Sequence, residues 1–105
     1  MRRCTDSVRD AIHRTVSKKR VAELASRLIR ERSDLSGDME YGAGQLLMRI
    51  AAEMGLEAEE QPVEGRRSNI LIRMRGAPGG KTLLYSGHID VVPPGAEELW
   101  HSPPF

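Results

Sequence analysis

Cysteine is almost absent from this sequence, with Cys4 as its single representative. Without a second cysteine the chain has neither an internal disulfide nor a cysteine cluster that could hold a metal, and we assign Cys4 no role. Aromatic residues are also scarce, and the four present are Tyr41, Tyr85, Trp100 and Phe105. Four scattered aromatic side chains are too few to form a stacking platform for nucleic-acid bases. We therefore expect neither a disulfide framework nor a nucleic-acid partner.

Long apolar runs are missing as well. No stretch approaches the roughly 18 consecutive apolar residues that span a bilayer. No apolar segment of the signal-peptide kind follows the first residues, and the early acids Asp6 and Asp10 argue against an organelle transit peptide. We therefore expect a cytoplasmic protein without a membrane partner.

What the chain does contain suits one small globular domain. It has 105 residues, of which 39% are hydrophobic and 30% charged, a length that is short for an enzyme with a water-excluding active site. Its net charge of +1 is unevenly spread, since residues 1–20 hold seven Lys or Arg against two Asp. Such a segment could contact an anionic surface, but its interspersed acids favour the solvated face of an amphipathic helix. We interpret residues 1–20 as a basic helical N-terminal extension.

Hydrophobic periodicity predicts helices in the first half of the chain. Apolar residues recur every three or four positions and indicate one long or two abutting helices over about residues 6–32. Residues 33–38 form a cluster of turn and cap residues. A further helix has its apolar face at Leu46, Leu47, Ile50, Ala51 and Met54. Gly55 is placed to end it, while Gly42 and Gly44 weaken its first turn and leave its start open.

The second half of the chain predicts strands. Residues 57–63 are acidic and reach Pro62, which makes them a poor strand that would lie at a sheet edge. Residues 69–75 and 81–87 are better strands, and the glycine-rich turn between them predicts a hairpin. The chain from Val92 onward reads as loop. This order of elements predicts an α/β fold with the N-terminal helices packed on a mixed β-sheet.

Gly79-Gly80-Lys81-Thr82 ends like a phosphate-binding loop. That motif requires a glycine where this chain has Arg75, and a helix directly after the lysine and threonine. The residues that follow predict a strand instead. We interpret the segment as an ordinary turn.

His88 and Asp90 are the strongest candidates for chemistry. His88 follows a predicted strand, where α/β sheets present ligand-binding groups, and imidazole suits zinc. Asp90 lies two residues further, so its carboxylate points to the same side and can orient the imidazole. The spacing alone leaves open a purely structural histidine.

Residues 83–93, followed by Gly95, Trp100 and Phe105, resemble the first metal motif of a hydrolase family. That family comprises acetylornithine deacetylase, succinyl-diaminopimelate desuccinylase, aminoacylase and carboxypeptidase G. Residues 35–38, 54–56 and 69–71 are similar to three further family segments. The resemblance implies that residues 21–105 are the incomplete N-terminal part of a zinc-exopeptidase-like catalytic domain, an α/β/α sandwich when complete.

By this resemblance, His88 is the first zinc ligand and Asp90 the acid that holds its ring. The complete enzyme would hold two zinc ions, with cobalt or manganese as substitutes, and would form a homodimer. It would cleave an amide bond in a small N-acyl amino acid or peptide. Trp100 and Phe105 resemble residues that anchor a loop near the site. We assign no metal-binding or general-base role to His13, His101, Glu97 or Glu98.

The family's bridging Asp, two further carboxylate ligands, second His and general-base Glu have no counterpart in this sequence. Catalytic zinc needs about three protein ligands, so we expect the chain alone to be inactive. We also expect it to be marginally stable and to self-associate, because the edge of the strand that carries His88 and one face of the sheet would be uncovered. The alternative is a stand-alone, non-catalytic module that binds a partner through its basic helix.

Overall fold

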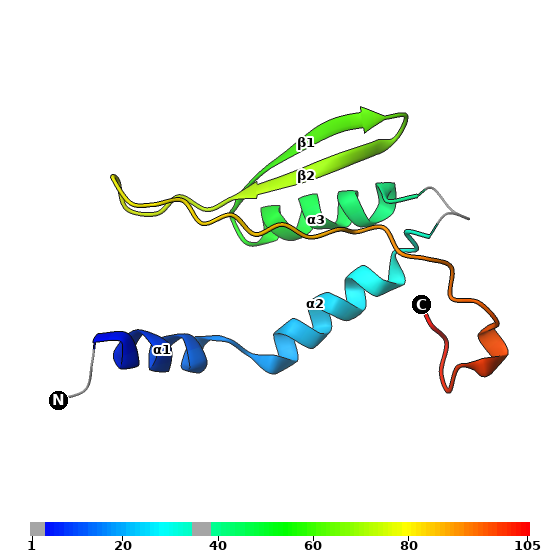
Figure 1. Cartoon of the computed structure of the whole chain (residues 1–105), viewed down its shortest axis with the longest axis horizontal. Helices are drawn as coiled ribbons and strands as arrows, with labels where there is room; N and C mark the ends of the chain where they lie inside the picture. Colours follow the sequence, from blue (N-terminus) through cyan, green and yellow to red (C-terminus); the bar gives the residue numbers. More distant parts are fainter. Residues whose placement is uncertain (1–3, 35–38) are drawn as a thin grey trace. The chain divides into compact units, whose positions relative to one another are not determined.

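The computed structural model describes residues 4–34 and 39–105, with side chains from Ser7 onward. The predicted similarity at residues 35–38 lies outside this part of the chain, and so does the side chain of Cys4. The described residues fall into two compact units, Met1–Arg30 and Glu31–Phe105. Three helices, a β-hairpin and a short 3₁₀ helix follow one another along the chain (Figure 1). The predicted division at residue 20 remains a prediction.

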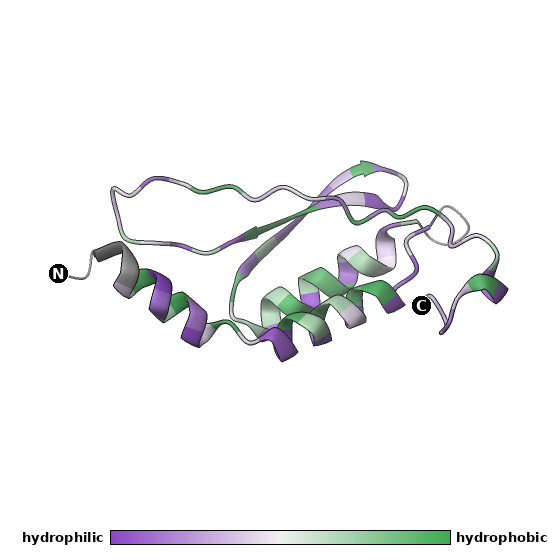
Figure 2. Cartoon of the chain, turned by 60° about the horizontal axis from the view of Figure 1, so that its bottom comes forward, coloured by the Kyte–Doolittle hydropathy of each residue, from purple (hydrophilic) through white to green (hydrophobic). Residues whose placement is uncertain are grey.

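The first unit contains two helices, α1 (Cys4–Thr15) and α2 (Lys18–Arg30). Ser17 separates them and caps α2, since the Arg20 N–H donates a hydrogen bond to Ser17 Oγ at 3.3 Å. Apolar and polar residues alternate along both helices (Figure 2), in agreement with the predicted amphipathic pattern. Within the described chain, none of the helices has the length and apolar content needed to cross a membrane.

Helix α3 (Tyr41–Glu53) supplies the core of the second unit. The buried apolar residues of the described chain all lie on it: Ala43, Leu46, Ile50 and Ala51. Gly55 adopts a φ of 68° and ends the helix in a Schellman motif. In this motif the Gly55 N–H donates to Ala52 O at 3.0 Å and the Leu56 N–H to Ala51 O at 2.8 Å. The predicted helix and its glycine stop are therefore confirmed.

A two-stranded antiparallel hairpin packs against α3. It consists of β1 (Glu57–Glu64) and β2 (Arg67–Arg73), joined by a tight turn in which Gly65 has a φ of 56°. The register places Ala58 opposite Ile72 and Glu60 opposite Ile70. Gly44 of α3 lies beside Ile70 of β2, where a Cβ on the glycine would be in ordinary contact with Ile70 Cδ1 at 3.4 Å.

Three sequence predictions about this sheet were wrong. The predicted hairpin between residues 69–75 and 81–87 does not form, because β2 pairs with β1 and residues 81–87 form no strand. The segment 57–63, judged a poor strand, lies within β1, although it does lie at an edge as expected. In the described chain the sheet is antiparallel rather than mixed. The structure is therefore a small α/β fragment.

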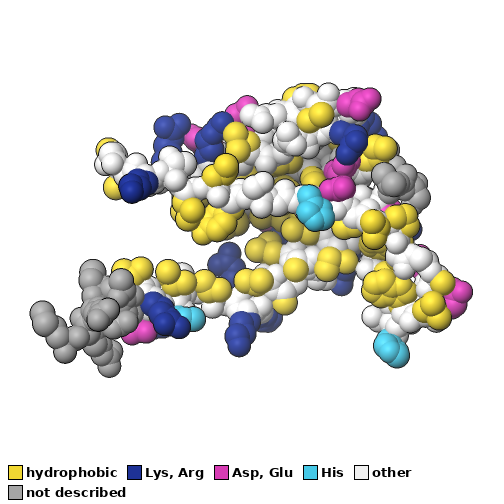
Figure 3. Space-filling model, viewed as in Figure 1, with side chains coloured by type: hydrophobic (Ala, Val, Ile, Leu, Met, Phe, Trp, Pro, Cys, Tyr) yellow, Lys and Arg dark blue, Asp and Glu magenta, His cyan; other side chains and the backbone are white. Residues whose placement is uncertain are grey.

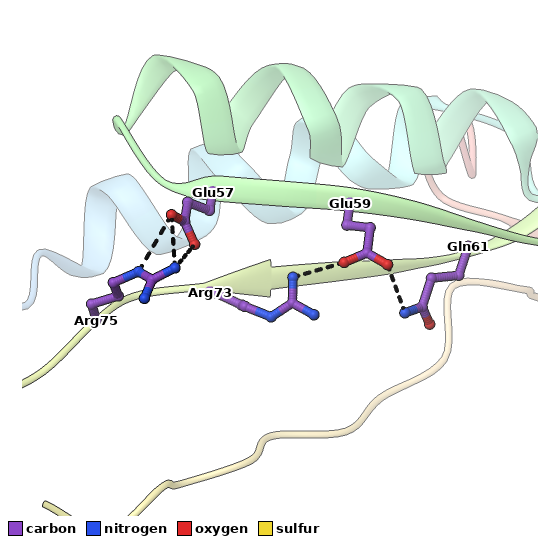
Figure 4. A network of polar contacts seen from close by, with 5 residues as sticks. All are labelled: Glu57, Glu59, Gln61, Arg73 and Arg75. Atoms are coloured by element: carbon purple, nitrogen blue, oxygen red, sulfur yellow. Dashed lines mark hydrogen bonds and ion pairs between the residues drawn. The ribbon is translucent and has the colours of Figure 1, made fainter. Parts of the chain in front are cut away.

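Charge pairing across the strands explains why the acidic segment forms β1. Arg73 Nη1 lies 2.8 Å from Glu59 Oε2, and Arg75 Nη2 lies 3.3 Å from Glu57 Oε1. Figure 4 shows these side chains, together with Gln61, extending from the side of the hairpin away from α3. The Gln61 amide and Arg73 both donate to Glu59 and lower the pKa of its carboxyl group. Glutamates that look unfavourable in isolation thus find arginine partners diagonally across the hairpin.

Two arginines at the hairpin turn hold the start of α3. The Arg66 guanidinium lies 3.8 Å from the centre of the Tyr41 ring. Arg67 binds Glu40, the residue before the helix, and its Nε–H donates to Glu40 Oε2 at 3.1 Å. These contacts compensate for the two glycines in the first turn, where intrinsic helix propensity is weak.

Candidate metal centre around His88

The segment that carries His88 lies beside the hairpin without joining it. Residues 84–90 and residues 67–71 line a common groove, so this segment faces the unpaired edge of β2. The chain is held just after the site, where the Val91 N–H donates to Ser33 O at 3.2 Å. His88 is therefore presented by an extended segment at the surface, with 83% of its side chain exposed.

Asp90 engages one nitrogen of the His88 ring. His88 Nδ1 lies 2.8 Å from the Asp90 carbonyl oxygen and 3.2 Å from Asp90 Oδ1. Both oxygens are acceptors, so Nδ1 carries the proton and donates it. In the neutral ring this leaves the lone pair on Nε2, which points to the other side of the imidazole. The geometry brings the two predicted residues together and leaves the Nε2 lone pair for a metal.

This arrangement fits one ligand of a zinc site. A zinc-binding histidine commonly donates its second nitrogen to a carboxylate or a carbonyl oxygen, and His88 donates to both kinds of group. The chemistry of one imidazole supplies a single ligand, whereas a catalytic zinc needs about three from the protein. Within residues 7–34 and 39–105, no group of three or more His, Cys, Asp or Glu side chains is placed to hold a metal.

A shallow pocket adjoins the His88–Asp90 pair. It is lined by Ser33, Met39, Glu40, Arg67, His88, Asp90, Val91 and Val92. The Arg67 guanidinium holds the pKa of Glu40 below its usual range, and Glu40 in turn raises the pKa of Arg67. Both partners therefore stay ionised near neutral pH, and an ion pair forms part of the pocket wall.

The sequence patterns did not single out Arg32, Asp34, Glu40 or Arg67. Asp34 is fully buried and lies in the segment interpreted as a turn, where its carboxylate pairs with Arg32. Its burial depends on contacts between residues far apart in the chain, for which no local pattern exists. An acid next to a predicted helix start and an arginine at a turn were the available signals for Glu40 and Arg67.

The remaining candidates lie in exposed positions. His13 is on α1, His101 follows the 3₁₀ helix η1 (Glu97–Leu99), and both are exposed. Glu97 and Glu98 are also exposed. Trp100 Nε1–H donates to Pro94 O at 3.1 Å, and the Phe105 ring lies under Arg32. Trp100 thus makes a contact within the loop and Phe105 one with Arg32 outside it, and their role as loop anchors stays a prediction.

Comparison with known proteins shows extended similarity to desuccinylases. The chain is 38% identical over 85 residues to succinyl-diaminopimelate desuccinylase of Leptothrix cholodnii, covering 78% of this chain and 22% of the relative. It is 41% identical over 83 residues to the same enzyme of Alkalilimnicola ehrlichii, covering 79% and 21%. No family model matches the chain. No solved structure matches it.

This similarity identifies the chain as a segment related to the succinyl-diaminopimelate desuccinylases. It belongs to the deacylase family that includes the succinyl-diaminopimelate desuccinylases, and it represents a part of that family's sequence. The chain spans about a fifth of the length of the curated relatives it matches. The resemblance inferred from residues 83–105 is thereby confirmed at the level of the family.

Proposed function

We propose that the complete protein is a zinc-dependent amide hydrolase that removes a succinyl group from an N-succinyl amino acid of the diaminopimelate type. The observation that carries this proposal is the His88–Asp90 pair, in a chain similar to succinyl-diaminopimelate desuccinylases. This substrate is one member of the wider class, N-acyl amino acids and small peptides, that the sequence resemblance implies.

In the proposed site, His88 binds zinc through Nε2, and Asp90 fixes the ring by accepting the Nδ1 proton. Zinc, when bound, polarises the scissile carbonyl and lowers the pKa of a bound water. Asp90 therefore acts on the reaction through His88, by holding its tautomer and direction. The other ligands and the general base would come from parts of the protein beyond this segment.

The proposal is tested by replacing His88 in the complete protein. We expect His88→Ala to lower zinc content and to abolish release of succinate from an N-succinyl amino acid. His101→Ala is the matched control, since it removes an exposed histidine from the loop that follows, and it should retain both zinc and activity. Full zinc occupancy and turnover in His88→Ala would refute the assignment.

Asp90→Asn separates the two roles within the pair. The amide keeps the size of the side chain but orients the imidazole less strongly, so we expect zinc affinity to fall about 10- to 100-fold. Competition with a chelator measures this change. An unchanged affinity would show that the Asp90 carboxylate does not hold the ring, since the variant keeps the backbone carbonyl that lies 2.8 Å from His88 Nδ1.

We further propose that this chain alone is inactive, because it supplies one recognisable zinc ligand. The alternative is a non-catalytic module that binds a partner through the basic N-terminal helix. The exposed basic surface of α1 and α2 supports this alternative. The coding sequence after Phe105 distinguishes the two. A glycine-rich segment with an Asp and then a Glu-Glu pair would support the enzyme, and tight stoichiometric zinc uptake by this chain alone would contradict its incompleteness.

A further inference from the structure

Residues 91–105 form a loop whose two ends meet at one tripeptide, Arg32–Asp34. At its first end the Val91 N–H donates to Ser33 O at 3.2 Å. At its other end the Phe105 ring lies 4.6 Å from the Arg32 guanidinium carbon. A loop of this length with adjacent ends has the form of an Ω-loop. Trp100 Nε1–H, which donates to Pro94 O at 3.1 Å, adds a contact inside the loop.

The tripeptide is well suited to act as a fixed base. Asp34 is fully buried, and its carboxylate accepts hydrogen bonds from Arg32 Nη2 at 2.7 Å and Arg32 Nε at 3.4 Å. A buried carboxylate is costly unless it is paired, so Asp34 holds the guanidinium in one plane. That plane then offers its face to the Phe105 ring.

The loop begins in the pocket beside His88. Ser33, Val91 and Val92 line that pocket together with His88 and Asp90. The hydrogen bond that closes the loop therefore also fixes the backbone directly after Asp90. If the base of the loop moved, Val91 and Val92 in the pocket wall would move with it.

We propose that Arg32 is a positioning residue, which clamps the loop of residues 91–105 by stacking on Phe105 while Asp34 fixes its orientation, and thereby holds the pocket wall beside His88. The importance of this pocket wall for catalysis rests on the proposed function. The contact between Arg32 and Phe105 that forms the clamp does not depend on that function. Its test can therefore be made on this chain without metal or substrate.

Hydrogen exchange at the Val91 amide reports whether the base of the loop is closed. We expect Phe105→Leu to speed this exchange about two- to fivefold, because leucine preserves apolar bulk but lacks the π-face that attracts a cation. Phe105→Tyr should restore the parent rate, since tyrosine provides an equivalent ring. A role in general packing would be met by leucine, so the rescue by tyrosine distinguishes a ring-specific contact from simple filling of space.

The partner residue is tested by Arg32→Met, which keeps a long stem and removes the charged plane. We expect faster Val91 exchange and stronger quenching of the single tryptophan, Trp100, by acrylamide. Arg49→Met is the matched control, because Arg49 lies on α3 and pairs with Glu31 at 4.0 Å rather than with the loop. The Leu56 amide, in the Schellman motif, monitors whether the rest of the unit stays folded.

If both Phe105→Leu and Arg32→Met leave Val91 exchange within twofold of the parent while Leu56 is unchanged, the clamp is refuted. Equal acceleration at Val91 and Leu56 would also refute it, because the effect would then be general unfolding. Neither result would alter zinc binding by His88 in the complete protein, so failure of the clamp and failure of the proposed function remain distinguishable.

Discussion

Glu40 and Arg67 join the start of α3 to the hairpin through a two-pronged ion pair. Arg67 lowers the pKa of Glu40 from its ordinary value of 4.5. A carboxyl group with a depressed pKa in the folded state adds stability above its unfolded pKa and loses it as the pH falls through the folded value. We therefore expect stability to be constant with respect to this pair above about pH 4.5 and to decline below it.

Replacing Glu40 with Gln tests this expectation. The variant should be less stable than the parent at pH 7, and the difference should shrink as the pH falls below 4.5. Urea unfolding followed by circular dichroism at several pH values measures both. Glu60→Gln serves as a control, since Glu60 accepts a hydrogen bond from Gln45 rather than from an arginine. A constant difference between parent and Glu40→Gln from pH 7 to pH 3 would contradict the assignment.

The His88–Asp90 pair could be predicted from sequence because its partners are two residues apart. Their contact depends on local backbone direction, which a short motif encodes. Arg32 and Phe105 meet across about seventy residues of chain, and Ser33 and Val91 across nearly sixty. Such contacts follow from the fold, so local patterns did not reveal the loop base.

At the scale of elements, two glycines of the α3 region have opposite roles. Gly44 is within the helix, and a Cβ there would meet Ile70 at an ordinary contact distance of 3.4 Å. Gly55 follows the helix with a φ of 68°, in a conformation that residues with a Cβ rarely adopt. The same change to alanine should therefore have opposite effects at the two positions.

We expect Gly44→Ala to stabilise the chain by up to about 1 kcal/mol through helix propensity. Gly55→Ala should destabilise it by about 1 kcal/mol, because alanine is strained in the left-handed region. Thermal unfolding of the two variants beside the parent provides the measurement. Destabilisation by Gly44→Ala would show that Ile70 cannot accommodate a methyl group, and stabilisation by Gly55→Ala would contradict the Schellman ending.

The helices were predictable because apolar residues recur along each of them, although the sequence left the break between α1 and α2 open. The strands were less predictable from the sequence, because β1 depends on arginines from β2 and from the residues just after it. Glu57 and Glu59 lower strand propensity when read alone, yet their side chains form diagonal ion pairs with Arg75 and Arg73 in the folded hairpin. Alternating glutamates followed at hairpin distance by alternating arginines would have been the informative signal.

At the scale of the whole molecule, apolar surface exceeds apolar core. The described residues bury four apolar side chains, all on α3, while many others remain exposed, as Figure 3 shows. Exposed apolar residues are prominent in the segment beside β2, among them Leu83, Leu84 and Tyr85. A core of this size supports marginal stability at best.

The unpaired edge of β2 and the apolar segment facing it form the surface by which we expect this chain to self-associate. Backbone groups along an open edge can pair with another chain, and a charge placed beside the edge opposes such pairing. We therefore expect Leu84→Lys to reduce the apparent mass in sedimentation at a given concentration. Leu99→Lys is a matched control, because Leu99 is exposed to a similar extent, 80% against 74%, but lies on η1 and outside the residues that line the groove. If both variants lowered association equally, net charge rather than the strand edge would be the cause, and a monomeric parent with a cooperative melt would overturn the prediction altogether.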